Sequence, residues 1–132
     1  MRSDRPKIVC LCGSTRFYDE FQRAYFDETM AGRIVLSVGF YAHSANRMPV
    51  EHGETVGITR EQKWALDDLH KRKIDLADEI LVLNVGGYIG SSTASEIMYA
   101  RRFGKGIRFL EPTPALPGDG AWSGTALEGG VV

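Results

Sequence analysis

The chain has 132 residues, 43% of them hydrophobic and 25% charged, and its 16 basic and 17 acidic residues give a formal net charge of −1. This length is typical of one domain, which buries enough surface to fold without a disulfide or a structural metal. The balanced charge argues against a surface that coats nucleic acid, because such surfaces carry a basic excess. The composition therefore predicts one ordinary globular domain that does not bind polymeric nucleic acid.

The order of the residues argues against several other kinds of protein. No apolar stretch approaches the ~20 residues that cross a bilayer, and residues 1–7 show no signal-peptide pattern. Cys10 and Cys12 are the only cysteines, and two positions apart in a strand they share one face in a geometry that is poor for a mutual disulfide. The three histidines show no ligand spacing. We therefore expect reduced, packed cysteines, no metal site and a cytoplasmic location.

The hydrophobic pattern predicts strands and helices in alternation, because short apolar runs alternate with apolar residues at helical spacing. In chain order, the predicted elements are a strand over 7–12, a helix from 17 to 32, a strand over 34–38, a long loop over 39–58, a helix from 59, a strand over 79–85, a helix over 93–103 and a strand over 106–110. This order is typical of a parallel sheet with helices on both faces. We therefore expect an α/β fold over residues 1–110, a Rossmann-like (flavodoxin-like) three-layer sandwich with a mainly parallel sheet of four or five strands.

The second helix and the C-terminal segment carry further apolar residues. In the second helix we expect one face to pack on the sheet, through Ala65, Leu66, Leu69 and Ile74, with Trp64 alongside. Residues 111–132 are rich in glycine and proline and show no period, which predicts a loosely held tail. Trp122 and Leu127 in this tail are candidates for docking on the domain or on a partner subunit.

Three helix starts carry capping signals. Ser14 or Thr15 offers an N-cap for the first helix. Thr59-x-x-Gln62 has the capping-box pattern at the start of the second helix, and Thr93-x-x-Glu96 repeats that pattern at the start of the third.

The first and third of these starts are also candidates for a ligand site, because ligands bind beyond the carboxyl ends of parallel strands. The turn Gly13-Ser14-Thr15-Arg16 combines a glycine, two hydroxyls and an arginine at a helix N-terminus, which suits a phosphate or another anion. It matches neither the dinucleotide-binding G-x-G-x-x-G nor the P-loop. The alternative is an N-cap beside a surface arginine.

The turn from Gly86 to Glu96 carries four hydroxyls in five positions, followed by a carboxylate. Its spacing does not separate a capping Glu96 from a catalytic one. Asn84 at the end of the third strand and Tyr88 in the turn are placed to contact a ligand. The segment after the second strand adds three candidates for a base pocket, which are Phe40, Tyr41 and His43.

The residues of these turns resemble a known family. The segments that carry the resemblance are Cys12 to Arg16, Ala77 to Leu83, and Gly90 to Ala100 followed by Gly104-Lys105. They are similar to the nucleoside 2-deoxyribosyltransferase-like superfamily, over roughly residues 7–110. This superfamily includes deoxyribosyltransferases and nucleoside 5′-monophosphate N-glycosidases, and the first turn is more similar to the latter.

The resemblance implies that Glu96 is a nucleophile that attacks the sugar C1′ and forms a covalent glycosyl-enzyme, which water or a second base then resolves. We expect the substrate contacts to come from Gly13, Ser14, Thr15, Arg16, Asn84, Gly90, Ser91 and Ser92. His70 or Tyr88 would protonate the leaving base. The expected ligand is a small nucleotide or nucleoside, with no cofactor, no metal and no membrane, and the resemblance also implies a homodimer.

The chain departs from the family at two acidic positions. His70 stands where members carry an Asp, eight residues before Asp78, and Gly90 stands where the transferases carry an Asp and the hydrolases tend to carry a Ser. A histidine suits proton donation at neutral pH, and its alternative is an ordinary helix-surface residue. Asp78 is expected to support a helix-to-strand junction. The sequence thus favours an N-glycosidase acting on a nucleoside 5′-monophosphate; the alternatives are a nucleoside 2-deoxyribosyltransferase and a non-catalytic nucleotide-binding or sensor module.

Overall fold

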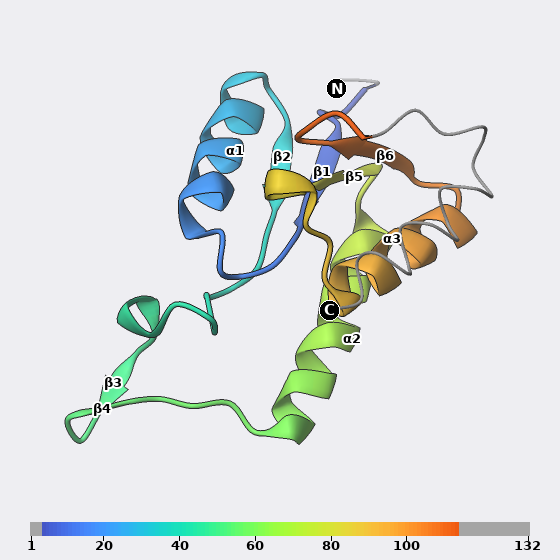
Figure 1. Ribbon diagram of the computed structural model, residues 1–132. Helices are drawn as coiled ribbons and strands as arrows, with labels where there is room; N and C mark the ends of the chain where they lie inside the picture. Colours follow the sequence, from blue (N-terminus) through green and yellow to red (C-terminus); the bar gives the residue numbers. More distant parts are fainter. Residues whose placement is uncertain (1–3, 114–132) are drawn as a thin grey trace.

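The computed structural model of the protein describes residues 4–113, which alternate strands and helices in the predicted order (Figure 1). The elements are β1 (Ile8–Cys12), α1 (Tyr18–Met30), β2 (Ile34–Leu36), the 3-10 turn η1 (Ala45–Arg47), β3 (Val50–Glu51), β4 (Glu54–Thr55), α2 (Arg60–Leu76), β5 (Glu79–Val82), the 3-10 turn η2 (Val85–Gly87), α3 (Ser91–Arg102) and β6 (Gly106–Phe109). Most of the predicted tail, including Trp122 and Leu127, lies outside the described residues.

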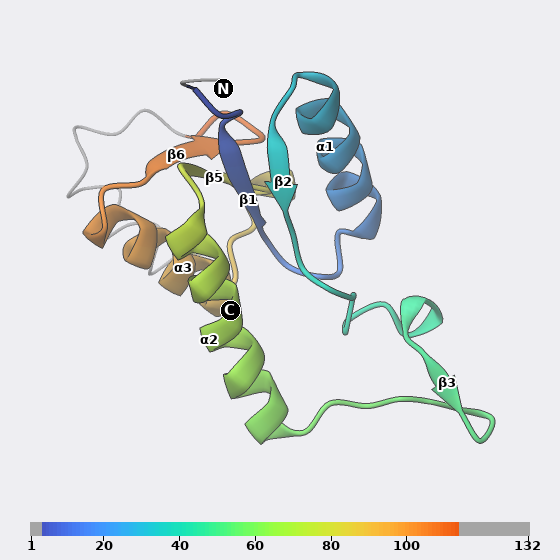
Figure 2. The ribbon, with the colours of Figure 1, turned by 180° about the vertical axis from the view of Figure 1, so that it is seen from behind.

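The main sheet has four parallel strands in the order β2-β1-β5-β6, as Figures 1 and 2 show from its two sides. The chain leaves β1 towards one edge, returns over the sheet through α2, and then builds towards the other edge through β5 and β6. The fold is therefore α/β and Rossmann-like (flavodoxin-like), as predicted. The order of connection reverses between β1 and β5, which is the point where such folds bind ligands.

The helices cover both faces of this sheet. On one face, Phe21 and Ala24 of α1 pack against Val9 and Leu11 of β1. On the other face, α2 and α3 pack against the alternate residues of β1 and β5, through Ile74, Ala94, Ile97 and Ala100 on the helices and Cys10, Cys12, Ile80 and Val82 on the strands. Side chains of a strand alternate between its faces, so both cysteines lie on the α2–α3 side, free and buried, as expected.

The N-terminal half of α2 extends beyond the sheet (Figure 2). Trp64 and Leu69 are 65% and 51% exposed, whereas His70 and Ile74 are buried. The prediction that one face of this helix packs on the sheet therefore holds for Ile74 and is wrong for Ala65 and Leu69, which are exposed. The physical reason is length, since a 17-residue helix is about 25 Å long and a strand of four or five residues only about 15 Å.

The segment 39–58, expected to be a loop, contains η1 and a small antiparallel hairpin of β3 and β4. His52 and Gly53 form its turn, both with positive φ, of 53° and 81°. The hairpin lies away from the main sheet (Figure 1). It shortly precedes α2 in the chain, but its ribbon is well separated from the projecting half of that helix. Strands of two residues leave no hydrophobic period, which is why the pattern did not predict them.

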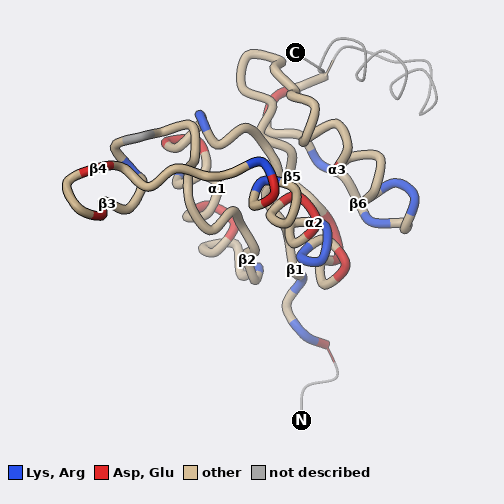
Figure 3. The backbone as a smooth tube through the Cα atoms, turned by 90° about the horizontal axis from the view of Figure 1, so that it is seen from below, with Lys and Arg blue, Asp and Glu red and all other residues tan. Residues whose placement is uncertain are grey.

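Charged residues of both signs are interspersed along the backbone, and α2 carries both (Figure 3). Arg72 of the basic run 71–73 forms salt bridges with Asp68 and Asp75. Asp78 has the expected structural role, because its carboxylate accepts hydrogen bonds from the Ile8 backbone N–H and from Arg5. No helix within residues 4–113 combines the length and the apolar character needed to cross a membrane.

Candidate functional site

A cavity of about 570 Å³ opens at the carboxyl ends of β1 and β5. The predicted site residues that line it are Gly13, Ser14, Thr15, Arg16, His70, Tyr88, Gly90, Ser91, Ser92 and Glu96. The turn after β1 and the turn after β5 supply most of them, and α2 supplies His70. The fold thus brings together two turns that are more than 70 positions apart, as parallel strand ends require.

The two turns are locked to each other. The backbone N–H of Leu83 donates to the Cys12 carbonyl, and a Cβ at Gly13 would lie only 3.1 Å from the Leu83 Cβ. Above this contact, Arg16 donates to the Tyr88 hydroxyl at 3.4 Å, and its guanidinium lies 4.6 Å from the Tyr88 ring centroid. Gly13 is therefore needed for the close approach of the two strands.

Two of the helices that begin at the cavity, α1 and α3, have no side-chain caps, so capping does not explain their polar residues; the third, α2, has the predicted capping box of Thr59 and Gln62. Helix α1 begins at Tyr18 with Phe17 as N-cap, so neither Ser14 nor Thr15 caps it. Ser14 instead accepts a hydrogen bond from the Arg16 Nε, and Thr15 pairs with the His43 Nδ1 at 2.6 Å. The turn before α1 therefore carries hydroxyl groups that do not cap this helix.

Helix α3 also begins earlier than predicted, at Ser91, with Gly90 as N-cap and no side-chain cap. Thr93 and Glu96 therefore lie inside the helix and form no capping box. Both are buried, on the face of α3 that also packs Ala100 against the sheet. Of the two explanations for Glu96, the cap is excluded, and the carboxylate is left facing the cavity.

Glu96 is 8% exposed, and burial raises its pKa to about 7. The positive charge of His70 and a hydrogen bond from the Cys12 thiol act in the opposite direction and lower the pKa. The Oε1 atom of Glu96 lies 4.0 Å from the Nε2 atom of His70. The carboxylate is thus poised between its charged and neutral forms near neutral pH.

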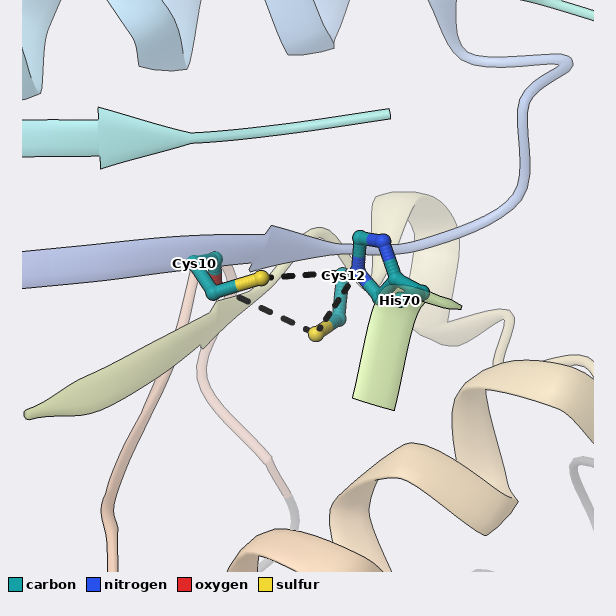
Figure 4. Close-up of side chains that lie close together, drawn as sticks. All are labelled: Cys10, Cys12 and His70. Carbon is teal, nitrogen blue, oxygen red and sulfur yellow. Dashed lines mark hydrogen bonds between the residues drawn. The ribbon is translucent and has the colours of Figure 1, made fainter. Parts of the chain in front are cut away.

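His70 lies beside the two cysteines of β1 (Figure 4). Its Nε2 lies 3.0 Å from the Leu11 carbonyl oxygen, 3.5 Å from the Cys10 Sγ and 3.6 Å from the Cys12 Sγ. Burial lowers the pKa of His70, but the hydrogen bond to Cys10 and the charge of Glu96 outweigh it, so that the pKa is raised. The hydrogen bond from Cys12 lowers the pKa of Cys10 to about 5, while burial raises that of Cys12.

The cavity is rich in positive charge. Its cationic side chains are Arg16, Arg60, Lys63 and Lys73, against the two carboxyl groups of Asp67 and Glu96. The ammonium group of Lys63 donates to the Ser92 Oγ at 3.0 Å and to Asp67 at 2.9 Å, so it is held beside the first turn of α3. An anionic ligand is the partner that such a surface attracts.

Two predicted contact residues lie outside the cavity. Asn84 is 2% exposed, and its side chain donates to the Glu111 carbonyl at 3.1 Å and accepts from the Glu111 N–H at 2.9 Å. It fastens the chain after β6 to the turn after β5, so the prediction of a ligand contact is wrong. Tyr41 packs edge-on against Tyr18 and Phe21 on the α1 side, whereas Phe40 and His43 do line the cavity.

Sequence reasoning missed Lys63 and the proximity of the cysteines to His70. Lys63 has one signal, the i, i+4 spacing to Asp67 that fixes its side chain, but nothing local indicates Ser92 as its second partner. His70 is 58 and 60 positions from the cysteines, and only the crossing of α2 over β1 brings them together.

Comparisons with protein-family models, with curated proteins and with solved structures found no match to this chain. The fold and the site therefore define it only as a Rossmann-like α/β protein with a cationic cavity, and a buried carboxyl group, at the carboxyl edge of its sheet.

Proposed function

We propose that this protein is an N-glycosidase that cleaves the N-glycosidic bond of a nucleoside 5′-monophosphate, with Glu96 as the nucleophile. The observation that carries the proposal is one cavity in which the buried Glu96 carboxyl group and the cations Arg16 and Lys63 occur together. A nucleoside 5′-monophosphate offers a matching pair of groups, an anionic phosphate and an electrophilic C1′ on the same small molecule.

The phosphate subsite would form at the helix starts. Arg16, already held by Ser14 and Tyr88, supplies a planar guanidinium for two phosphate oxygens. Lys63 and the Ser92 hydroxyl supply further donors. Because α3 has no side-chain cap, the first backbone N–H groups of this helix also stay available to an anion.

The reaction would proceed by two displacements at C1′. In the first, a carboxylate oxygen of Glu96 bonds to C1′ while the bond from C1′ to the base nitrogen breaks, and an acid gives that nitrogen a proton. In the second, water adds its hydroxyl to C1′, its proton goes to solvent, and the carboxylate is released. The products are the free base and a sugar 5-phosphate.

Tyr88 is the better placed of the two candidate acids. A side-chain carbon at Gly90 would lie 3.1 Å from the Tyr88 hydroxyl, so this phenol occupies the space of the Asp that the resemblance implies for the transferases. The Nε2 of His70 is directed at Leu11 and the thiols, beneath Glu96. We infer that His70 acts as a positioning residue that controls the charge of Glu96, and that Tyr88 donates the proton.

The proposal is tested by base release. Ribo- and deoxyribonucleoside 5′-monophosphates and the corresponding nucleosides are incubated with the protein in the presence of a chelator, with and without an acceptor base, and the products are separated by chromatography. Glu96→Gln is the test variant, and Glu61→Gln, an exposed glutamate at the start of α2, is its matched control. Release from a monophosphate that is lost only in Glu96→Gln supports the proposal.

The same assay separates the alternatives. Release that requires the acceptor base indicates a deoxyribosyltransferase. Nucleotide binding without any release overturns the enzymatic proposal in favour of a binding or sensor module.

We also propose that the protein is a homodimer. Trp64 and Leu69 expose large apolar surfaces on the part of α2 that extends beyond the sheet, and Leu69 also lines the cavity. Apolar surface of this kind is stabilised when a second copy covers it. Light scattering at micromolar concentration is expected to give the mass of a dimer, and Trp64→Glu the mass of a monomer; a monomeric parent protein contradicts the proposal.

A further inference from the structure

The cluster of Cys10, Cys12 and His70 lies beneath the cavity, and base release does not explain its two thiols. The two thiols share one face of β1 because they are two positions apart, and α2 brings His70 onto the same face (Figure 4). All three residues are buried, and their Sγ and Nε2 atoms lie within 4.8 Å of one another. Two sulfur donors and one imidazole nitrogen are ligands that zinc and similar transition metals prefer.

The two sulfur–nitrogen distances match a tetrahedral metal site. With Zn–S bonds of about 2.3 Å and Zn–N bonds of about 2.0–2.1 Å, tetrahedral angles place sulfur and nitrogen about 3.6 Å apart. The Nε2 atom of His70 lies 3.5 Å from the Cys10 Sγ and 3.6 Å from the Cys12 Sγ. An ion placed among the three atoms therefore needs little rearrangement of either backbone element.

A fourth donor lies next to the cluster. The Oε1 atom of Glu96 is 4.0 Å from the His70 Nε2, against about 3.4 Å for nitrogen and oxygen ligands of one tetrahedral zinc ion. The carboxylate therefore has to move closer to His70 to bind the same ion. His70 and Glu96 also line the cavity, whereas the thiols are fully buried, so an ion would enter from the cavity side.

We propose that Cys10, Cys12, His70 and Glu96 form a binding site for one divalent transition-metal ion of the zinc type. Binding replaces the hydrogen bond between the His70 Nε2 and the Leu11 carbonyl by a metal–nitrogen bond, and the imidazole keeps its proton on Nδ1. Both sulfurs bind as thiolates and the His70 Nε2 binds without a proton, so the protons that these three atoms carry before binding pass to solvent.

The metal would also control the proposed reaction, a consequence that rests on the proposed function. A carboxylate oxygen bound to the metal cannot attack C1′, so the metal-bound protein is expected to release no base, and a chelator to restore release. Metal binding itself is measured without substrate. Failure of the metal site therefore leaves the result for base release untouched, and the reverse also holds.

Cobalt(II) is the probe for this site, because tetrahedral Co²⁺ bound to thiolates gives sulfur-to-metal charge-transfer bands and intense visible bands. Protein freed of metal by a chelator and kept reduced is titrated with Co²⁺. The bands are expected to saturate at one ion per chain, and one equivalent of Zn²⁺ to abolish them. Absence of charge-transfer bands in the parent protein overturns the proposal, and this outcome does not depend on the folding of any variant.

The variants assign the ligands. Cys10→Ser and Cys12→Ser are each expected to reduce the charge-transfer absorption, and His70→Gln to weaken Co²⁺ binding at least tenfold. His52→Asn, an exposed histidine in the turn of the β3–β4 hairpin, is the matched control and keeps the full spectrum, since Asn tolerates its positive φ. Full absorption in both cysteine variants, or loss of the bands in His52→Asn, contradicts the assigned site.

Discussion

Helices α2 and α3 begin with the same sequence pattern and use it differently. At the start of α2, the Gln62 backbone N–H donates to the Thr59 hydroxyl at 3.1 Å, and the Thr59 N–H donates to the Gln62 side chain at 2.9 Å. This is the predicted capping box. At the start of α3, Thr93 and Glu96 have the same spacing, but the helix begins two residues before Thr93 and neither side chain caps it.

The difference shows that a capping pattern predicts a nearby helix. Whether its side chains cap that helix depends on where the fold places the helix start. Both helix starts border the cavity, since Thr59 and Arg60 line it as well as Ser91 and Ser92. The start of α2 projects beyond the sheet, and there the side chains of its capping box pair with the terminal backbone N–H groups. The start of α3 lies at the carboxyl edge of the sheet beside the cavity. There, the side chains that do not cap stay available for a ligand, which in our proposal is a nucleotide.

The largest expected effect follows from changing the glutamate of the α3 pattern. Glu96→Gln keeps the shape of the side chain but removes the nucleophilic oxygen, so we expect base release to fall by about a thousandfold or more. Stability is expected to change little, because no cap is lost. Steady-state kinetics together with urea unfolding separate the two effects. A variant that unfolds early and keeps its turnover per folded molecule would return Glu96 to a structural role.

A smaller effect is expected at the turn after β1. Arg16→Gln removes the guanidinium that Ser14 and Tyr88 hold at the cavity, so KM for a monophosphate should rise about tenfold to a hundredfold. The corresponding nucleoside lacks the phosphate, and its kinetics should hardly change. The measurement is the change that Arg16→Gln causes for the monophosphate, divided by the change that it causes for the nucleoside. Equal losses for both substrates would mean that Arg16 supports the turn and does not bind phosphate.

Most of the fold was predictable because each core element carries its own periodic signal. The strand over 7–12 and the strand over 79–85 each contain an apolar run, and β1 and β5 are buried in the structure as such runs require. Gly32 and Gly104 marked the ends of α1 and α3, and both adopt the positive φ that this position favours. The projecting half of α2 was not predictable, since helical periodicity does not report where the sheet beneath it ends.

The candidate site was predictable only where single turns contribute to it. The two turns after β1 and β5 were identified from their glycines, hydroxyls and charges, because parallel strands bring such turns to one edge. Asn84 has the same local signal as these residues, yet its partner is the backbone of Glu111, a contact made across 27 positions. The contacts of His70 with the thiols depend in the same way on the path of α2, which no local pattern records.

The pH dependence of base release is a further test of Glu96, because release is expected to follow the ionisation of its carboxyl group. Burial raises the pKa of Glu96 to about 7, and the reaction needs the carboxylate, so release should increase as pH rises from about 6 to 8. The charge of His70 lowers the pKa of Glu96, so His70→Gln should move this rise to higher pH and reduce release at pH 6. A pH series of kcat/KM in the presence of a chelator is the measurement. A rise that stays at the same pH in His70→Gln would contradict the positioning role.

The smallest expected effect lies at the start of α2, where the pattern does cap. Gln62→Ala removes one of the two reciprocal hydrogen bonds, and we expect the free energy of unfolding to fall by about 0.5–1 kcal/mol, since the better helix propensity of alanine offsets part of the loss. Ser95→Ala, an exposed position near the start of α3, is the matched control and should leave the free energy within about 0.5 kcal/mol.

Urea unfolding of both variants, followed by base release from the folded proteins, completes the contrast between the two helix starts. Gln62 does not line the cavity, so Gln62→Ala should lose stability and keep its turnover, which is the opposite of the result expected for Glu96→Gln. The same four-residue pattern would then stabilise the folded protein at the start of α2 and supply a reacting group at the start of α3. If Gln62→Ala and Glu96→Gln instead lost stability alike and both kept their turnover, Glu96 would have a structural role, and the proposal that it is the nucleophile would fail.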